Sequence, residues 1–442
     1  MKRKALWKTR RRHVASEIFL FVLLLPFQVL AADEYSFDLK EFEDHNLKWG
    51  GYLEGKWEHS ALNRDGALTV LNDFRDLRST RDIVGATVQL DGSYKWGKTS
   101  LNWVAQVTGS QDEDTWQDQV DIFEAYASIK INPGLSLDAG KKTFKWGKGY
   151  AWNPVGFIDR PKDPNNPEDA MEGYIGTGLD LVKSYDGPLQ TVALTTVVLP
   201  VWQEVNEDFG VRDNLNLAAK LYLLYLDTDI DLVGFTGNSR STRYGVDFSR
   251  NLATNFEIHG ELAHIPKQRQ MVLDTLTGIP LPRERSDTSY LFGLRYLTEN
   301  DMTTIVEFYH NDDGYTDAEQ EDFFRLIDRG YAAYLSNGDS NLLRQASRIG
   351  QSGYLAPQSG RDYLYTRITW KEPYDILYFT PGVTAIVNTD DQSFSVSPET
   401  VYTGFTNWEL RLRFSWLQGQ IYSEYGEKQN SNKVEFRVRY FW

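Results

Sequence analysis

Apolar and polar residues alternate with a period of two along most of the chain after residue 46. In residues 47–58, 101–108, 215–223 and 409–416, every second side chain is apolar or Gly, and the residues between them are mostly polar. Successive side chains of a β-strand point to opposite faces, so this pattern predicts strands with one apolar face. No apolar run after Ala31 is long enough for a transmembrane helix.

The connections between these segments are of two kinds, short and long, which alternate along the chain. Tight turns rich in Gly, Pro, Asn or Asp occur at 96–98, 132–134, 186–188, 227–228, 251–254 and 299–301. Longer polar loops are expected at roughly 61–80, 111–119, 148–177, 202–211, 267–286 and 313–360. Short turns at one end and long loops at the other are typical of an antiparallel, up-and-down transmembrane β-barrel, the shorter connections facing the periplasm. A soluble β-sandwich would seldom place Trp, Leu and Phe at successive outward positions of so many strands.

Counting the alternating segments predicts an all-β barrel of about 18 strands, with 16 as the fallback. The uncertainty lies in residues 375–405, which Pro381 and Pro398 interrupt, and near residues 238–241. The count must be even if both termini face the periplasm.

The two ends of the chain predict export to the bacterial outer membrane. Residues 1–31 have a basic head, a short apolar centre and small residues before a cleavage point, which is the pattern of a secretory signal peptide. Residues 32–45 are expected to form an acidic periplasmic lead-in, and residues 46–442 the barrel. At the C-terminus, apolar residues alternate up to a terminal aromatic, through Val434, Phe436, Val438, Tyr440 and Trp442.

That final strand, VEFRVRYFW, resembles the signal by which Gram-negative outer-membrane proteins are recognised for insertion. Together with the signal peptide and the alternation over residues 46–442, it resembles the Gram-negative porins. The segment NWELRLRF gives a looser likeness to alginate-export-type substrate-selective channels. The resemblance implies a channel in contact with outer-membrane lipid, lipopolysaccharide and the assembly machinery, as a monomer or a homo-oligomer.

Composition narrows the chemistry further. The chain has no Cys, which removes disulfides, thiolate metal sites and Cys nucleophiles. Its formal net charge is −15, which argues against nucleic acid as a partner. Aromatic residues make up 14% of the chain, and many of them suit the interfacial girdles of a barrel. No metal or cofactor is expected.

Basic residues at inward positions are the first candidates for contact with solute. If the apolar side chains face lipid, these residues line the lumen: Arg411, Arg413, Arg437, Arg439, Arg295, Arg367 and Lys220. A ladder of guanidinium groups raises the local anion concentration and holds carboxylate or phosphate in a bidentate manner. Glu409 and Glu435 lie in the same rows, so cross-strand ion pairs are the competing interpretation.

The loop at 148–177 is the second candidate, because its aromatic and proline content is unusual for a free surface loop. In the general porins the third extracellular loop folds inward and narrows the channel, and this is also the third long loop here. By that resemblance, the constriction would involve Trp152, Asp159, Arg160, Lys162 and Asp163. The alternative is an outside cap on the rim. In the loop at 313–360, residues 323–335 have the spacing of one amphipathic helix.

Three functions remain open on the sequence alone. The first is a passive or substrate-selective channel for small hydrophilic solutes, with anions favoured. The second is a structural sheath around a partner protein such as an electron-transfer component, which would need a lumen free of an inward loop. The third and weakest is an outer-membrane enzyme using His259 beside Glu257 and Glu261, for which no nucleophilic Ser motif is present.

Overall fold

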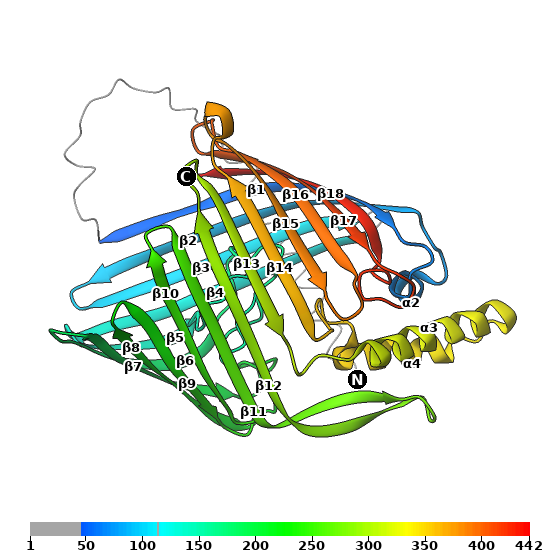
Figure 1. The fold of residues 1–442 in the computed structure, drawn as a ribbon, viewed down its shortest axis with the longest axis horizontal. Coiled ribbons are helices and arrows are strands. Elements are labelled where there is room, and N and C mark those ends of the chain that lie inside the picture. The colour runs from blue at the N-terminus through cyan, green and yellow to red at the C-terminus, as the bar shows by residue number, and fades with distance from the viewer. Residues whose placement is uncertain (1–45, 113–114) are drawn as a thin grey trace, which may run out of the picture.

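The computed structural model describes residues 46–112 and 115–442, and these residues form a closed antiparallel β-barrel of 18 strands (Figure 1). The expected signal peptide at 1–31 and lead-in at 32–45 lie outside the described residues. The bounds of the strands are β1 (Leu47–Leu62), β2 (Thr80–Trp96), β3 (Thr99–Asp112), β4 (Thr115–Asn132), β5 (Leu135–Lys142), β6 (Tyr174–Ser184), β7 (Leu189–Val201), β8 (Asn214–Tyr225), β9 (Thr228–Thr236), β10 (Arg243–Ala253), β11 (Phe256–Asp274), β12 (Ile279–Leu297), β13 (Met302–His310), β14 (Asp362–Trp370), β15 (Phe379–Asn388), β16 (Phe394–Tyr402), β17 (Trp408–Gln418) and β18 (Asn430–Phe441).

Each strand pairs with its neighbours in sequence, and β18 closes the ring against β1. The closing register joins Leu53 to Tyr440 and Trp57 to Phe436. Closure leaves no open strand edge, which a hydrocarbon environment requires because it offers backbone groups no hydrogen-bonding partner. The prediction of 18 strands is confirmed, and the fallback of 16 is wrong. Pro381 and Pro398 lie inside β15 and β16 rather than ending them.

The two faces of the barrel follow the alternation in the sequence. Trp49, Leu101, Leu215 and Phe292 are exposed on the outer face. Charged side chains between such apolar positions are buried, as in the run from Glu435 on β18. The outer face therefore suits lipid, and the inner face holds the polar chemistry.

Long connections gather at one end of the barrel and short turns at the other (Figure 1). The predicted loop at 267–286 is wrong, because β11 and β12 continue as a long hairpin that projects beyond the barrel. Its tight connection, residues 275–278, ends at Gly278, whose φ of +69° favours glycine. Residues 115–119 of the loop predicted at 111–119 belong to β4, and the loop predicted at 148–177 occupies residues 143–173.

Helices cover part of the mouth at the end with the long loops. They are α2 (Ala67–Asp73), α3 (Asp317–Asn337) and α4 (Asn341–Ile349), followed by the π-helical turn η2 (Gly350–Tyr354). A short 3₁₀ turn, η3 (Pro373–Asp375), lies at the opposite end. In the part of the chain that the structure describes, no helix combines the length and the apolar character needed to span a membrane.

The predicted amphipathic helix at 323–335 is confirmed as part of α3. A capping box between Thr316 and Glu319 begins it, and Gly338, with φ of +76°, ends it. Phe323 and Ile327 are buried against α4, and with α2 they form an apolar core outside the barrel.

Candidate functional site

The connection between β5 and β6, residues 143–173, folds into the barrel; we call it the crossing loop. Its side chains and backbone contact inward residues of β9–β13 and of β17 and β18. Its beginning packs with the strands from β6 to β11 in an apolar core that includes Trp146, Val155, Phe157 and Ile158. This core explains why so apolar a loop does not lie on the surface: folding inward removes these side chains from water.

Asp159 fixes the root of the crossing loop. Its carboxylate accepts hydrogen bonds from the backbone N–H groups of Phe144, Lys145 and Trp146, at 3.0, 2.9 and 2.8 Å. Burial raises the pKa of the Asp159 carboxyl above its usual value, although these three amide donors act in the opposite direction. Asp159 therefore ties two distant parts of the loop together.

Glu261 of β11 holds the first half of the crossing loop against the barrel wall. One of its oxygens accepts from the amides of Lys148 and Gly149, both at 2.6 Å, and the other accepts from Val155 at 3.2 Å. Glu261 is only 4% exposed. A buried carboxylate is costly unless it is well bonded, and here the loop backbone provides the donors.

Glu307 of β13 likewise accepts hydrogen bonds from backbone amides, those of the next two residues of the crossing loop. It accepts from the amide of Tyr150 and, at 2.8 Å, from that of Ala151. His259 Nε2 lies 2.8 Å from the same carboxylate and orients it from the neighbouring side. Glu307 is fully buried. Two wall carboxylates thus clamp the successive loop amides of residues 148–151.

A third attachment uses a side chain of the loop. Lys148 Nζ lies 2.9 Å from Asp231 and 3.9 Å from Asp247, on β9 and β10, and both aspartates are buried. We call the inward carboxylates Asp231, Asp247, Glu261 and Glu307 the anchoring wall. Every one of them faces the crossing loop.

The other side of the lumen carries the predicted arginines, but in paired form. Among the described residues, seven basic side chains and five carboxylates of β1, β14 and β16–β18 form inward ion pairs; we call this set the paired wall. The pairs join Arg367 and Arg413 to Glu399, Arg411 to Glu409, Arg437 to Glu435, Arg439 to Glu54, and Lys56 and Lys433 to Glu58. The Arg413–Glu399 and Arg437–Glu435 contacts are both 2.6 Å. The wall retains a small positive excess.

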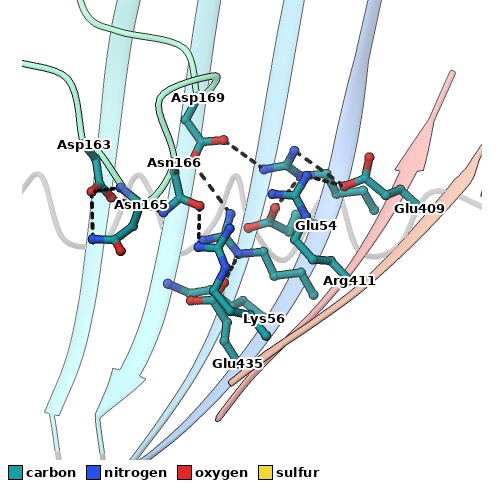
Figure 2. Close-up of polar contacts among 12 residues, drawn as sticks. Glu54, Lys56, Asp163, Asn165, Asn166, Asp169, Glu409, Arg411 and Glu435 are labelled. Atoms are coloured by element: carbon teal, nitrogen blue, oxygen red, sulfur yellow. Dashed lines mark hydrogen bonds and ion pairs between the residues drawn. The ribbon is translucent and has the colours of Figure 1, made fainter. Parts of the chain in front are cut away.

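The tip of the crossing loop touches this wall (Figure 2). Arg413 Nη1 donates a 2.7 Å hydrogen bond to the amide oxygen of Asn166. The Asp169 carboxylate lies between two guanidinium groups, 3.7 Å from Arg437 and 3.6 Å from Arg439. The loop therefore reaches from the anchoring wall to the paired wall and narrows the lumen between them.

A cavity of about 440 Å³ lies between the crossing loop and strands β11–β14. Lys148, Lys162, Arg295, Arg367 and Glu168 are among its lining residues. It places two predicted inward arginines, Arg295 and Arg367, at one polar space beside the loop.

The structure brings five of the predicted lumen residues together and separates two. Arg411, Arg413, Arg437 and Arg439 form one group, and Arg367 joins it through Glu399. Arg295 of β12 lies outside this ion-paired group and shares only the cavity beside the crossing loop with Arg367. Lys220 of β8 lies 4.0 Å from Asp231, close to the anchoring wall. Contact of these residues with solute stays a prediction.

The predicted constriction residues have varied surroundings in the crossing loop. Trp152 is buried and stacks on Tyr309 at a centroid distance of 5.1 Å. Arg160 pairs with Glu172 and Asp208.

The remaining two residues bond mainly within the loop. Lys162 Nζ donates to the carbonyl oxygens of Gly149 and Tyr150. Asp163 accepts from Asn165 and Asn166, which shapes the tip (Figure 2). Their contact with solute likewise stays a prediction.

Sequence reasoning missed the residues that hold the loop and pair the arginines. Glu307 and Glu399 are at inward positions of predicted strands, so alternation alone could have placed them in the lumen. Asp169 lies in a loop, where the sequence carries no signal for its partner. Glu435 and Glu409 do form ion pairs, but their nearest partners, Arg437 and Arg411, lie on the same strand as each of them. The expected cross-strand arrangement is present for Glu409 and Arg439, at 4.0 Å.

Comparison with known families and curated sequences gives no match: no family model and no curated protein matches this chain.

Solved structures do match, at low sequence identity. OprD, an outer-membrane protein of Pseudomonas aeruginosa, is 10% identical, with a TM-score of 0.51 over 90% of this chain and 94% of that one. OpdQ of the same organism is 10% identical, with a TM-score of 0.50 over 90% and 99%. Wzi of Escherichia coli, described as a carbohydrate-binding β-barrel involved in capsule assembly, is 8% identical, with a TM-score of 0.52 over 88% and 83%. At this identity the likeness concerns the fold, and in fold the chain is a Gram-negative porin-type barrel.

Proposed function

We propose that this protein is an outer-membrane channel through which small hydrophilic solutes diffuse, with anions favoured. The observation that carries the proposal is the crossing loop, which is fixed to one wall by Glu261 and Glu307 and ends at the arginines of the other. A barrel of this size holds an aqueous lumen unless something fills it, and an inward loop converts that lumen into a narrow, selective passage.

The preference for anions follows from the charges at the narrowest contact. Arg413, Arg437 and Arg439 meet the loop tip, and their guanidinium groups keep their charge at any physiological pH. The carboxylates paired with these basic groups reduce the field, but the paired wall keeps more basic than acidic groups. Such a wall favours passage of anions without excluding cations.

The two other functions are less well supported. A sheath around a partner protein needs a clear lumen, whereas the crossing loop reaches from β11 and β13 to β17 and β18. For an enzyme, His259 would have to be free, but it is 3% exposed and bonded to Glu307, which holds the loop. The proposed location brings contact with outer-membrane lipid, lipopolysaccharide and the assembly machinery.

OprD and OpdQ share the barrel and support the proposal by fold alone. The predicted signal peptide and the aromatic C-terminal strand support the proposed location.

The test is single-channel recording of the protein refolded in detergent and inserted into a planar bilayer, with the reversal potential measured in a KCl gradient. Wild-type protein is expected to open steadily and to prefer chloride. Arg411→Ala combined with Arg437→Ala should shift the reversal potential toward cations, because two positive charges are removed and Glu409 and Glu435 each lose their nearest partner.

Arg325→Ala is the matched control, since Arg325 lies on α3 outside the barrel and forms its ion pair with Glu321 of the same helix. It should leave the reversal potential near that of the wild type. Folded protein that never opens would refute the channel, and an unchanged reversal potential in the double variant would refute the role of the arginines.

A further inference from the structure

We propose that Asp169 is a tethered competitor: its carboxylate occupies the position of an anionic solute on Arg437 and Arg439, and a solute carboxylate or phosphate must displace it to pass. This inference rests on the proposed channel. It adds a residue of the crossing loop that sets how strongly anions are held, whereas the arginines alone would set only the sign of the preference.

The geometry of Asp169 is that of a bound anion. One carboxylate oxygen faces Arg437 Nη1 and the other faces Arg439 Nη2, so a single group bridges two guanidiniums on one strand (Figure 2). Guanidinium groups recognise carboxylate and phosphate through the same paired arrangement of donors. A solute with either group would therefore seek the site that Asp169 already fills.

The contact of Asp169 with the two arginines is weak enough for a solute anion to displace it. Asp169 lies 3.7 and 3.6 Å from its two partners, which is beyond good hydrogen-bond distance, and its side chain is 45% exposed. The fixed partners of the same arginines are closer: Glu435 lies 2.6 Å from Arg437, and Glu54 lies 2.5 Å from Arg439. An incoming anion would thus exchange with Asp169 before it disturbed the wall.

The rest of the tip is suited to hold the loop while Asp169 moves. Asn166 keeps a neutral 2.7 Å hydrogen bond with Arg413, and Asp163 is bonded to the amides and side chains of its neighbours. Glu172, near the end of the loop, pairs with Arg160 and Lys141. Displacement of one carboxylate does not require the loop to leave the lumen.

The experiment measures block of the chloride current by succinate in planar bilayers. In Asp169→Asn, the half-blocking concentration of succinate should fall about tenfold, which corresponds to roughly 1.4 kcal/mol of lost competition. Asp169→Glu keeps the charge and should stay close to wild type. An unchanged half-blocking concentration in Asp169→Asn would overturn the inference.

A second variant separates displacement from a general change of field. Exchanging neighbours, as Asp169→Ala with Ala170→Asp, keeps the charge of the tip but moves it off the two arginines. If Asp169 is displaced by the solute, the half-blocking concentration of succinate in this double variant should fall as it does in Asp169→Asn. A half-blocking concentration like that of the wild type would overturn the inference. Channels that conduct but show no such difference would leave the channel standing, whereas folded protein that never conducts would refute the channel itself.

Discussion

The two sides of the lumen use the same residue type for opposite purposes. Glu261 and Glu307 on the anchoring wall accept hydrogen bonds from loop amides, whereas Glu399 and Glu435 on the paired wall bind arginine side chains. All four are buried to a similar degree, between 0 and 5% exposed. The extent of burial therefore does not distinguish carboxylates that hold the loop from carboxylates that pair with arginine. The two roles differ in the hydrogen-bond donor that each carboxylate meets.

The difference has a physical consequence for how each wall responds to change. A carboxylate that satisfies backbone amides holds a segment in place, and its loss leaves donors unsatisfied in a buried setting. A carboxylate paired with arginine mainly adjusts local charge, and its loss leaves an unpaired cation facing the solute. The anchoring wall is thus expected to control the shape of the passage, and the paired wall its selectivity.

The largest effect is expected from removing an anchor. Glu261→Ala should raise single-channel conductance severalfold and increase current noise, because three backbone amides lose their acceptor at about 1–3 kcal/mol each. Limited proteolysis should then cut within the crossing loop. Glu284→Gln, an exposed acid on β12, is the control for the loss of one negative charge. Conductance and proteolysis like those of the wild type would show that Glu261 does not hold the loop.

A moderate effect is expected from the paired wall. Glu399→Gln should increase chloride preference with little change of conductance, because Arg367 and Arg413 both lose their carboxylate. The reversal potential in a KCl gradient measures this. Gel migration with and without heating checks that the barrel has folded, since unpaired buried charge also costs stability. A shift toward cations would contradict the assignment of the paired wall.

The smallest effect on conduction is expected from the group of helices α2, α3 and α4, which we call the helical cap. Phe323→Ala removes a buried side chain from the core of α2, α3 and α4, and core truncations of this kind cost about 3–5 kcal/mol locally. Hydrogen exchange should become faster in α3, while conductance and reversal potential stay near wild type. A large change in conductance would place the cap in the passage and weaken the contrast between the two walls.

The sequence alone determined the barrel, and it did so through local rules. Alternation with period two and the turn residues between segments are properties of short stretches of chain, so each strand could be recognised without its neighbours. The same rules placed Arg437 and Arg439 on the inner face. They failed at residues 267–286, where the polar run at 267–270 and the prolines at 280 and 282 conceal a hairpin that projects outside the barrel.

Only the tertiary structure decided which partner each inward carboxylate meets. Glu261 and Glu399 look alike in sequence, since each is an acid at an inward strand position. The first faces amides of a loop more than 100 residues away in sequence, and the second faces arginines on adjacent or nearby strands. Alternation fixes the face on which a side chain lies, but strand register and the path of a folded loop fix what lies opposite, and those depend on the closed barrel as a whole.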